Sequence, residues 1–176
     1  MTLNNSENEK LQGGLRLKKI FKKSTNQKPL ITIVTSVLNG EQYLEETILS
    51  VINQGYKNIE YIIIDGGSKD GSIKIIKKYK NFIDYMESKK DNGIFHAVHK
   101  GIIKSKGKYI LWINSDDILH PKAAENIVNV FQKNPKIDWI NGICGYIKYG
   151  LKFFFIPYIY PRKLILTGKA HKKFYG

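Results

Sequence analysis

Residues 59–71, IEYIIIDGGSKDG, join an almost wholly apolar run to a polar, glycine-rich ending. A continuous apolar run of this length with β-branched residues is typical of a strand buried on both faces of a parallel sheet. Residues 30–36 and 109–114 have the same character, and residues 83–88 predict a shorter strand. These runs therefore predict a sheet whose central strands are parallel.

Helical patterns lie between the predicted strands. Leu44, Ile48 and Val51 follow i, i+4, i+7 spacing, and Asn39 and Gln42 precede them like a capping pair. Similar spacing predicts three further helices: behind Asp70, behind Asp91 and from Pro121. The alternation of strand and helix indicates an α/β fold, a Rossmann-like, mainly parallel sheet with flanking helices.

Three of the predicted strands end in polar residues. The first ends in Thr35 and Ser36, the second runs into residues 65–71, and the third into residues 114–117. Ligands of open α/β sheets bind beyond the carboxyl ends of the strands. Turn chemistry explains one such ending, since turns favour Asp, Ser and Gly, but it explains three at one edge less well.

The acidic pair Asp116 and Asp117 follows the third strand directly. Two unit charges about 4 Å apart interact by roughly 4 kcal/mol at an effective dielectric of about 20, so the pair favours a counter-charge. A divalent cation supplies one and can hold a diphosphate at the same time. The alternative is a helix cap before Pro121.

The other motifs fit known ligand sites less well. Residues 65–71 lack the acidic spacing of a Ca²⁺ loop and the Gly-x4-Gly-Lys-Ser/Thr pattern of a P-loop. His96 and His99 share a predicted helix face, but no third ligand is evident, so we expect them to be polar residues facing a cleft. Cys144 is expected to be a small buried thiol.

Composition indicates a globular chain with an unusual charge. The 176 residues suffice for one domain, and 29 Lys and Arg against 15 Asp and Glu give a net charge of +14. Such a surplus suits an anionic partner or reflects solvated lysines. Residues 1–28 are expected to form a basic, loosely ordered leader that is able to lie on an anionic lipid surface. No apolar run approaches the roughly 20 residues of a membrane span.

Three segments in order resemble the family 2 glycosyltransferases of the GT-A fold. They are PLITIVTSVLNGEQYLEETILSVINQGYKNIEYIIIDGGSKDGS (residues 29–72), SKKDNGIFHAVHKGI (residues 88–102) and GKYILWINSDD (residues 107–117). The resemblance implies inverting transfer of a sugar from a nucleotide-diphosphate donor, usually a UDP-sugar, helped by Mn²⁺ or Mg²⁺. It implies a nucleotide-sugar-binding domain over residues 29–176. The protein is then expected to be cytoplasmic, or peripheral at the inner face of a membrane, and to serve surface polysaccharide or glycolipid synthesis.

The resemblance also assigns roles to residues of these segments. Thr35 and Asp65 should border the nucleobase, Asp116 should hold the ribose, and Asp117 should bind the metal directly. Further nucleotide-binding positions are implied in the first and middle motifs: Asn39, Glu41, Asp91 and Gly93. The middle motif departs from the family pattern at five positions: Lys89, Phe95, His96, Val98 and His99.

The end of the chain departs further. Family members continue into an acceptor-binding half that supplies an acidic general base. After Asp117 the acidic residues are Glu125 and Asp138, and neither lies in a matching motif. We therefore expect the base beyond Gly176, a GT-A domain that is incomplete at its C-terminus, and weak or no transfer by this chain alone. The partners implied are the nucleotide sugar and a saccharide or lipid-linked acceptor.

The sequence also raises two other functions. A basic module for RNA or a membrane surface draws on the net charge and the leader, but no RNA motif is present. A response-regulator-like receiver with Asp65 as phosphate acceptor lacks the paired acid at the first strand.

Overall fold

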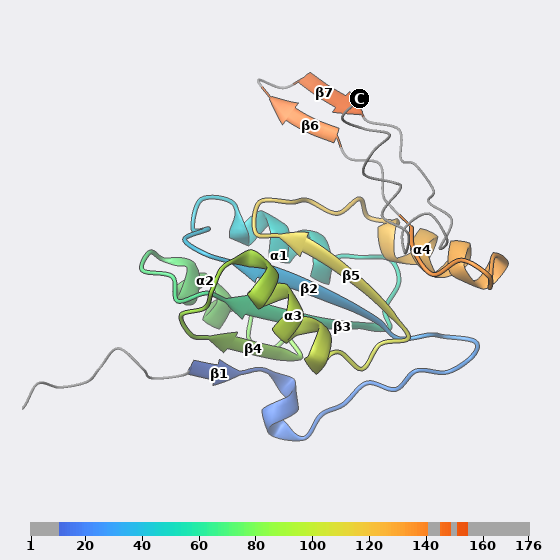
Figure 1. The fold of residues 1–176 in the computed structure, drawn as a ribbon, viewed down its shortest axis with the longest axis horizontal. Coiled ribbons are helices and arrows are strands. Elements are labelled where there is room, and N and C mark those ends of the chain that lie inside the picture. Colours follow the sequence, from blue (N-terminus) through green and yellow to red (C-terminus); the bar gives the residue numbers. More distant parts are fainter. Residues whose placement is uncertain (1–10, 141–144, 149–150, 155–176) are drawn as a thin grey trace, which may run out of the picture. The chain divides into compact units, whose positions relative to one another are not determined.

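The structure, a computed structural model, describes residues 11–140, 145–148 and 151–154. Within the compact unit formed by Met1–Val128, five strands form one sheet in the order β1-β4-β3-β2-β5 (Figure 1). The strands are β1 (Leu11–Gly13), β2 (Ile31–Val37), β3 (Ile59–Asp65), β4 (Tyr85–Ser88) and β5 (Tyr109–Asn114). Strands β2 to β5 are parallel and β1 is antiparallel to β4. The predicted mainly parallel α/β sheet is confirmed.

Helices cover both faces of this sheet, as Figure 1 shows. They are α1 (Leu44–Ile52), α2 (Ser72–Lys78) and α3 (Ile94–Lys104); a fourth helix, α4 (Ala123–Lys133), follows β5 in the chain. Residues of α1 and α2 pack in the larger core cluster, whereas Ala97 of α3 packs with Val34, Ile62 and Ile64 on the opposite face. The four predicted helices are confirmed, because the apolar face of each has a sheet or core to cover.

Helix α3 lies close to the sheet because of Gly101. This residue is buried, and a Cβ atom placed on it would collide with the Val34 side chain of β2. The close approach brings α3 onto the central strands β2 and β3. It also fixes the segment before the helix, residues 89–93, beside the carboxyl end of β4.

The prediction of a loosely ordered leader is wrong for residues 11–28. Strand β1 extends the sheet beside β4, and a 3-10 helix, η2 (Leu15–Lys18), follows it. Arg16 forms an ion pair with Glu60 of β3, and Lys22 Nζ lies 2.8 Å from Asp84 Oδ2. The leader is ordered because its basic side chains neutralise buried carboxylates that would otherwise have no counter-charge. Residues 1–10 lie outside the described residues.

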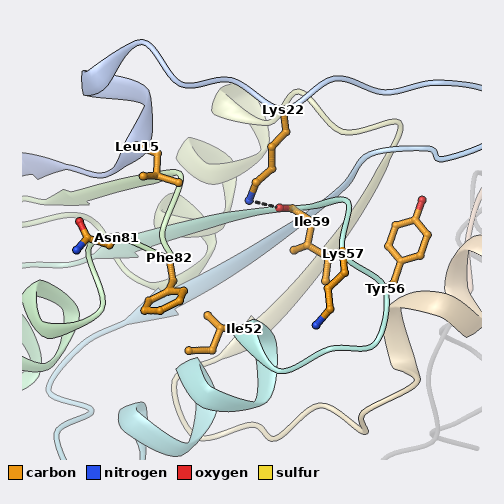
Figure 2. A pocket seen from close by; sticks show the side chains of 8 residues that line it. All are labelled: Leu15, Lys22, Ile52, Tyr56, Lys57, Ile59, Asn81 and Phe82. Carbon is orange, nitrogen blue, oxygen red and sulfur yellow. Dashed lines mark hydrogen bonds between the residues drawn. The ribbon is translucent and has the colours of Figure 1, made fainter.

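Apolar contacts also hold the leader against the amino end of β3. Figure 2 shows a cavity where Leu15 and Lys22 of the leader meet Ile52, Ile59 and Phe82. Lys22 Nζ donates a hydrogen bond to the carbonyl oxygen of Ile59 across this cavity. The leader is therefore part of the folded unit at the end of the sheet opposite to the predicted ligand edge.

The second unit, Asn129–Gly176, contains a described hairpin. Strand β6 (Gly145–Lys148) pairs antiparallel with β7 (Leu151–Phe154). Cys144, predicted to be a buried thiol, lies outside the described residues. Within the part of the chain that the structure describes, no helix is both long and apolar enough to cross a bilayer.

Candidate functional site

The polar ends of the four parallel strands lie at one edge of the sheet. In the strand register Val37 is opposite Asp65, Asp65 is opposite Ser88, and Ser36 is opposite Asn114. The strands therefore end at nearly the same level, and the loops that follow them are neighbours. This confirms that the three polar endings read from the sequence meet at the carboxyl edge, and it adds the end of β4 to them.

Asp65 organises the loop after β3. Its side chain is buried, and its Oδ2 accepts hydrogen bonds from the backbone N–H groups of Gly67 (2.9 Å) and Ser68 (3.0 Å) and from the Ser88 hydroxyl (2.6 Å). The Ser68 hydroxyl donates to Oδ1. A carboxylate that accepts this many hydrogen bonds locks the backbone around it. Asp65 thus joins the ends of β3 and β4 and fixes the backbone of the β3 loop at the carboxyl edge.

The loops after β2 and β3 are held together by reciprocal hydrogen bonds. Asn39 N donates to Ser68 Oγ (2.8 Å), and Asn39 Oδ1 accepts from Lys69 N (2.8 Å). Glu41 N donates to Asp70 Oδ2 (2.9 Å), and Glu41 Oε2 accepts from the N–H of residue 71 (2.8 Å). Asn39 has a left-handed φ of 52°. The predicted capping pair at α1 is wrong, because Asn39 uses its side chain to bind the β3 loop.

Asp70 supports this joint and gives it a pH dependence. Partial burial acts to raise its pKa, but hydrogen bonds from Ser72 and from Glu41 N outweigh burial and lower it below the usual value. A carboxyl group with a lowered folded-state pKa stabilises the protein above its unfolded pKa of about 3.9, and this contribution is lost as the pH falls through the folded value.

We expect Asp70→Ala to lower the free energy of unfolding by about 1 kcal/mol at pH 6, since two loop hydrogen bonds lose their acceptor. The difference from the wild type should shrink as the pH falls below the unfolded pKa of about 3.9 and through the lower folded-state pKa, because the ionised form then loses its advantage in the folded state. Urea denaturation at several pH values measures it. A difference that is the same at all of these pH values would contradict the assigned role of the ionised carboxylate.

Thr35 lies beneath the edge rather than on it. Its side chain is fully buried, and its hydroxyl lies 3.1 Å from the hydroxyl of Tyr61, whose pKa is raised by burial. The Thr35 and Tyr61 pair supports the ends of β2 and β3 from below. The contact of Thr35 with a nucleobase stays a prediction.

The segment between β4 and α3 closes one side of the edge. Asp91 Oδ1 accepts a hydrogen bond from Gly93 N (3.0 Å), and Gly93 adopts a left-handed φ of 102° where α3 begins. Asp91 Oδ1 would lie only 3.1 Å from a Cβ on Gly66, so the glycine there lets this segment approach the β3 loop. Lys100 Nζ lies 3.8 Å from Asp91 Oδ2 and compensates its charge. The structure thus brings Asp91 and Gly93 beside the loop that Asp65 organises.

The acidic pair at the end of β5 closes the other side. Asp116 and Asp117 are exposed, and the β5 ending touches the β2 loop, since a Cβ on Gly40 would lie 2.8 Å from Ser115 Oγ. Asp117 Oδ2 accepts a hydrogen bond from Asn114 N (2.7 Å), which forms a tight turn. Among the described residues no basic side chain forms an ion pair with either carboxylate. The remaining carboxylate oxygens are hard donors of the kind that Mg²⁺ and Mn²⁺ bind.

The protein alone offers few ligands for such an ion. Within the described residues, no group of three or more His, Cys, Asp or Glu side chains is placed to hold a metal. His96 Nδ1 accepts a hydrogen bond from Asn92 N (3.1 Å), so it serves the turn before α3. The residues present fit an ion that takes one or two carboxylates from the protein and its other ligands from a phosphate-bearing substrate and water.

Ser68, Ser88 and Tyr61 are part of this edge, and sequence reasoning did not single them out as site residues. Ser88 ends the short fourth strand, so the rule of polar strand ends could have found it. Ser68 lies within the polar ending 65–71, so the same rule covers it, whereas Tyr61 carries no such signal and is recognised only through its partner Thr35.

Comparison with protein families and curated proteins gives consistent matches. The family profile described as Glycosyl transferase family 2 matches residues 32–167. An uncharacterized glycosyltransferase of Rickettsia prowazekii is 39% identical over 118 residues, which cover 67% of this chain and 36% of that protein. The poly(ribitol-phosphate) beta-N-acetylglucosaminyltransferase TarP of Staphylococcus aureus is 34% identical over 127 residues, 69% of this chain and 37% of TarP. The matched segment thus spans less than two fifths of these relatives.

Solved structures share the fold at lower identity. S. aureus TarS residues 1–349 in complex with UDP-GlcNAc superposes with a TM-score of 0.56 at 18% identity, covering 64% of this chain and 36% of TarS. The mannosyltransferase PcManGT from Pyrobaculum calidifontis in complex with GDP-Man and Mn²⁺ superposes with a TM-score of 0.59 at 16% identity, covering 69% of this chain and 38% of PcManGT. The GT-A fold expected from the resemblance is confirmed, over part of the length of these structures.

Proposed function

The chain belongs to glycosyl transferase family 2, and on this basis we propose that its carboxyl edge binds a nucleotide-diphosphate sugar, with UDP as the nucleotide, for an inverting transfer. The observation that carries the proposal is the edge itself. Loops after β2, β3 and β4 are joined by hydrogen bonds around Asp65. Asp116 and Asp117, which form no ion pair with any residue that the structure describes, lie at the neighbouring end of β5.

The two sides of this edge suit different parts of the donor. We assign the nucleoside to the side formed by Thr35, Asp65 and the 91–93 segment, which offers backbone and carboxylate hydrogen-bonding groups. The β2 loop with Asn39 and Glu41 would line the same side. Asp116 would accept hydrogen bonds from the ribose hydroxyl groups.

Asp117 would hold a divalent cation, Mn²⁺ or Mg²⁺, against the diphosphate. Its Oδ2 is fixed by Asn114 N, which orients the carboxylate before any ligand arrives. Such an ion neutralises the charge that develops on the leaving diphosphate. The same ion would remove the repulsion between two neighbouring carboxylates that lack a basic partner among the described residues.

The reaction proposed joins the anomeric carbon of the donor sugar to an acceptor oxygen and breaks its bond to the diphosphate. The acceptor's proton must pass to a base. No residue that the structure describes is assigned this role. We propose a saccharide or lipid-linked acceptor of surface polysaccharide or glycolipid synthesis. The name of the relative TarP, a transferase for poly(ribitol-phosphate), supports an acceptor of this class.

Calorimetric titration of the chain with UDP tests the proposed donor and metal. With Mn²⁺ present we expect saturable binding, and removal of the ion with a chelator should weaken it at least about tenfold, since the diphosphate then faces two uncompensated carboxylates. GDP should bind more weakly than UDP. Binding that is unchanged by the chelator would contradict the metal site, and absence of binding for both nucleotides would contradict the proposed function.

A further inference from the structure

Two segments distant in sequence form one surface at the end of α3. Arg16 Nη1 of the leader donates a hydrogen bond to the carbonyl oxygen of Lys104 (2.6 Å), and Lys106 Nζ lies 4.0 Å from the ring centre of Phe21. In Figure 1, η2 lies beside the carboxyl-terminal end of α3. We call this surface, with the groove next to it, the basic face; its residues are Leu17, Lys19, Ile20, Phe21, Lys89, Lys90, Ile103 and Lys106.

Large apolar side chains stand out from the basic face. The exposed fraction is 59% for Leu17, 49% for Ile20, 50% for Phe21 and 69% for Ile103. Single exposed apolar residues are normal, but several that alternate with lysines on one face are a feature of interaction surfaces. None of these four belongs to the carboxyl edge; of the basic face, only Lys89 and Lys90 lie beside that edge, at the far end of the groove.

The groove beside Ile103 extends the positive charge along α3. It has a volume of about 410 Å³ and is lined by basic groups together with Ile103 and Glu87: Lys89, Lys90, His96, Lys100 and Lys104. Glu87 is buried, with a side chain 5% exposed, and it lies within 3.9 Å of Lys100 and 3.7 Å of Lys104. The acidic charge of this groove is therefore already compensated from within the protein.

The same holds for the other carboxylates of this region. Residues 11–28 contain no Asp or Glu. Glu60 is paired with Arg16, Asp84 with Lys22, and Asp91 with Lys100, and none of these carboxylate side chains is more than 5% exposed. Lysines 19, 89, 90 and 106 have no acidic partner among the described residues. The basic face thus presents uncompensated positive charge.

We propose that the basic face binds an anionic lipid bilayer, with its lysines at the headgroups and Leu17, Ile20, Phe21 and Ile103 inserted at the level of the acyl chains. The charge is complementary to an anionic leaflet, which attracts basic residues at its surface. The transfer of aliphatic side chains from water into the acyl region is favourable. A nucleic-acid partner would use stacking aromatic groups, and three of these four side chains are aliphatic.

Co-sedimentation of the full chain with lipid vesicles tests this proposal. We expect binding to phosphatidylcholine vesicles that contain about 30% phosphatidylglycerol, little binding to pure phosphatidylcholine, and a loss of binding as salt rises from about 0.1 M to about 0.5 M. The double variant Lys19→Ala, Lys106→Ala should bind at least about tenfold more weakly. Ile103→Ser should weaken binding at least about threefold, since it removes an inserted side chain.

Variants on the opposite face of the sheet provide matched controls. Lys77→Ala with Lys80→Ala removes two exposed lysines near α2, and Leu49→Ser removes an apolar side chain that is 37% exposed on α1. Both should bind vesicles as the wild type does, with thermal melting used to confirm folding. Equal losses in control and test variants would overturn the proposal. Absence of binding to anionic vesicles would also overturn the proposal. A third contradicting result would be binding to single-stranded RNA that is tighter than binding to vesicles and that Ile103→Ser leaves unchanged.

Discussion

Replacing Asp117 with alanine is expected to abolish the metal-dependent part of UDP binding, so that Mn²⁺ no longer strengthens the interaction measured by calorimetry. The wild-type gain is expected to be at least about tenfold, equivalent to about 1.4 kcal/mol. The variant should fall to the affinity that the wild type shows with a chelator. The reason is that Asp117 offers the oriented carboxylate of the pair, with Oδ2 held 2.7 Å from Asn114 N.

Asp117→Asn distinguishes the role of Asp117 as a metal ligand from its role in the turn after β5. Asparagine can still accept the hydrogen bond from Asn114 N, so the turn after β5 should persist, but the neutral amide is a poor ligand for the ion. We therefore expect the asparagine variant to lose the Mn²⁺ effect as completely as alanine, with unfolding stability closer to that of the wild type. Retention of the Mn²⁺ effect in Asp117→Asn would contradict direct ligation by the carboxylate.

Glu125→Ala is the matched control for charge. Glu125 is an exposed carboxylate of α4, outside the matched motifs, and its removal changes the net charge by the same amount. UDP binding and its response to Mn²⁺ should be unchanged. If Glu125→Ala weakens the metal response as strongly as Asp117→Ala, the effect arises from overall charge and the proposed ligand is wrong.

The central strands β2 and β3 could be predicted from the sequence because they are buried on both faces. Such strands appear as short continuous apolar runs, and the predicted runs 30–36, 59–65 and 109–114 coincide with β2, β3 and β5 to within one residue. Strand β5 has the same apolar pattern, but it lies at the edge of the sheet with Ile110 and Trp112 partly exposed, so the expectation of burial on both faces is wrong for it. Parallel pairing then places the polar ends of all three strands at one edge without further information. For this reason the position of the candidate site followed from the pattern alone.

The connections within the edge could not be predicted, since they depend on partners distant in sequence. Asn39 precedes a helix with cap-like spacing, but its oxygen accepts a hydrogen bond from Lys69 N. Thr35 ends its strand in a polar position, yet it is fully buried against Tyr61. A cap, a loop contact and a buried pair use the same residue types, so only the fold distinguishes them.

The order of the leader was missed for a similar reason. A basic segment with few long apolar runs is typical of a solvated arm. The leader is held in place by Glu60 of β3 and by Asp84, which directly precedes β4. The sequence pattern would place both carboxylates among buried apolar residues. A carboxylate inside a sheet requires a basic partner, and the leader supplies Arg16 and Lys22 from outside the matched motifs.

We expect Arg16→Ala to lower the free energy of unfolding by about 3–5 kcal/mol, because it leaves the Glu60 carboxylate buried without its cation. Glu60 has a side chain only 3% exposed and also accepts hydrogen bonds from Thr32 Oγ1 and Lys106 N, both at 2.7 Å. These donors hold the carboxylate in place, so it cannot turn to solvent without breaking them. Urea denaturation followed by circular dichroism measures the loss.

The double variant Arg16→Ala, Glu60→Gln tests the cause of that loss. Glutamine keeps an oxygen for Thr32 and Lys106 but carries no charge, so it should recover much of the stability that the single variant loses. As a control, Lys78→Ala breaks the exposed pair with Glu45, at 2.6 Å, and should change stability far less because water solvates both groups. If Arg16→Ala were no more destabilising than Lys78→Ala, or if Glu60→Gln gave no recovery, the leader would be held by its apolar contacts and its strand pairing instead of by neutralisation of Glu60.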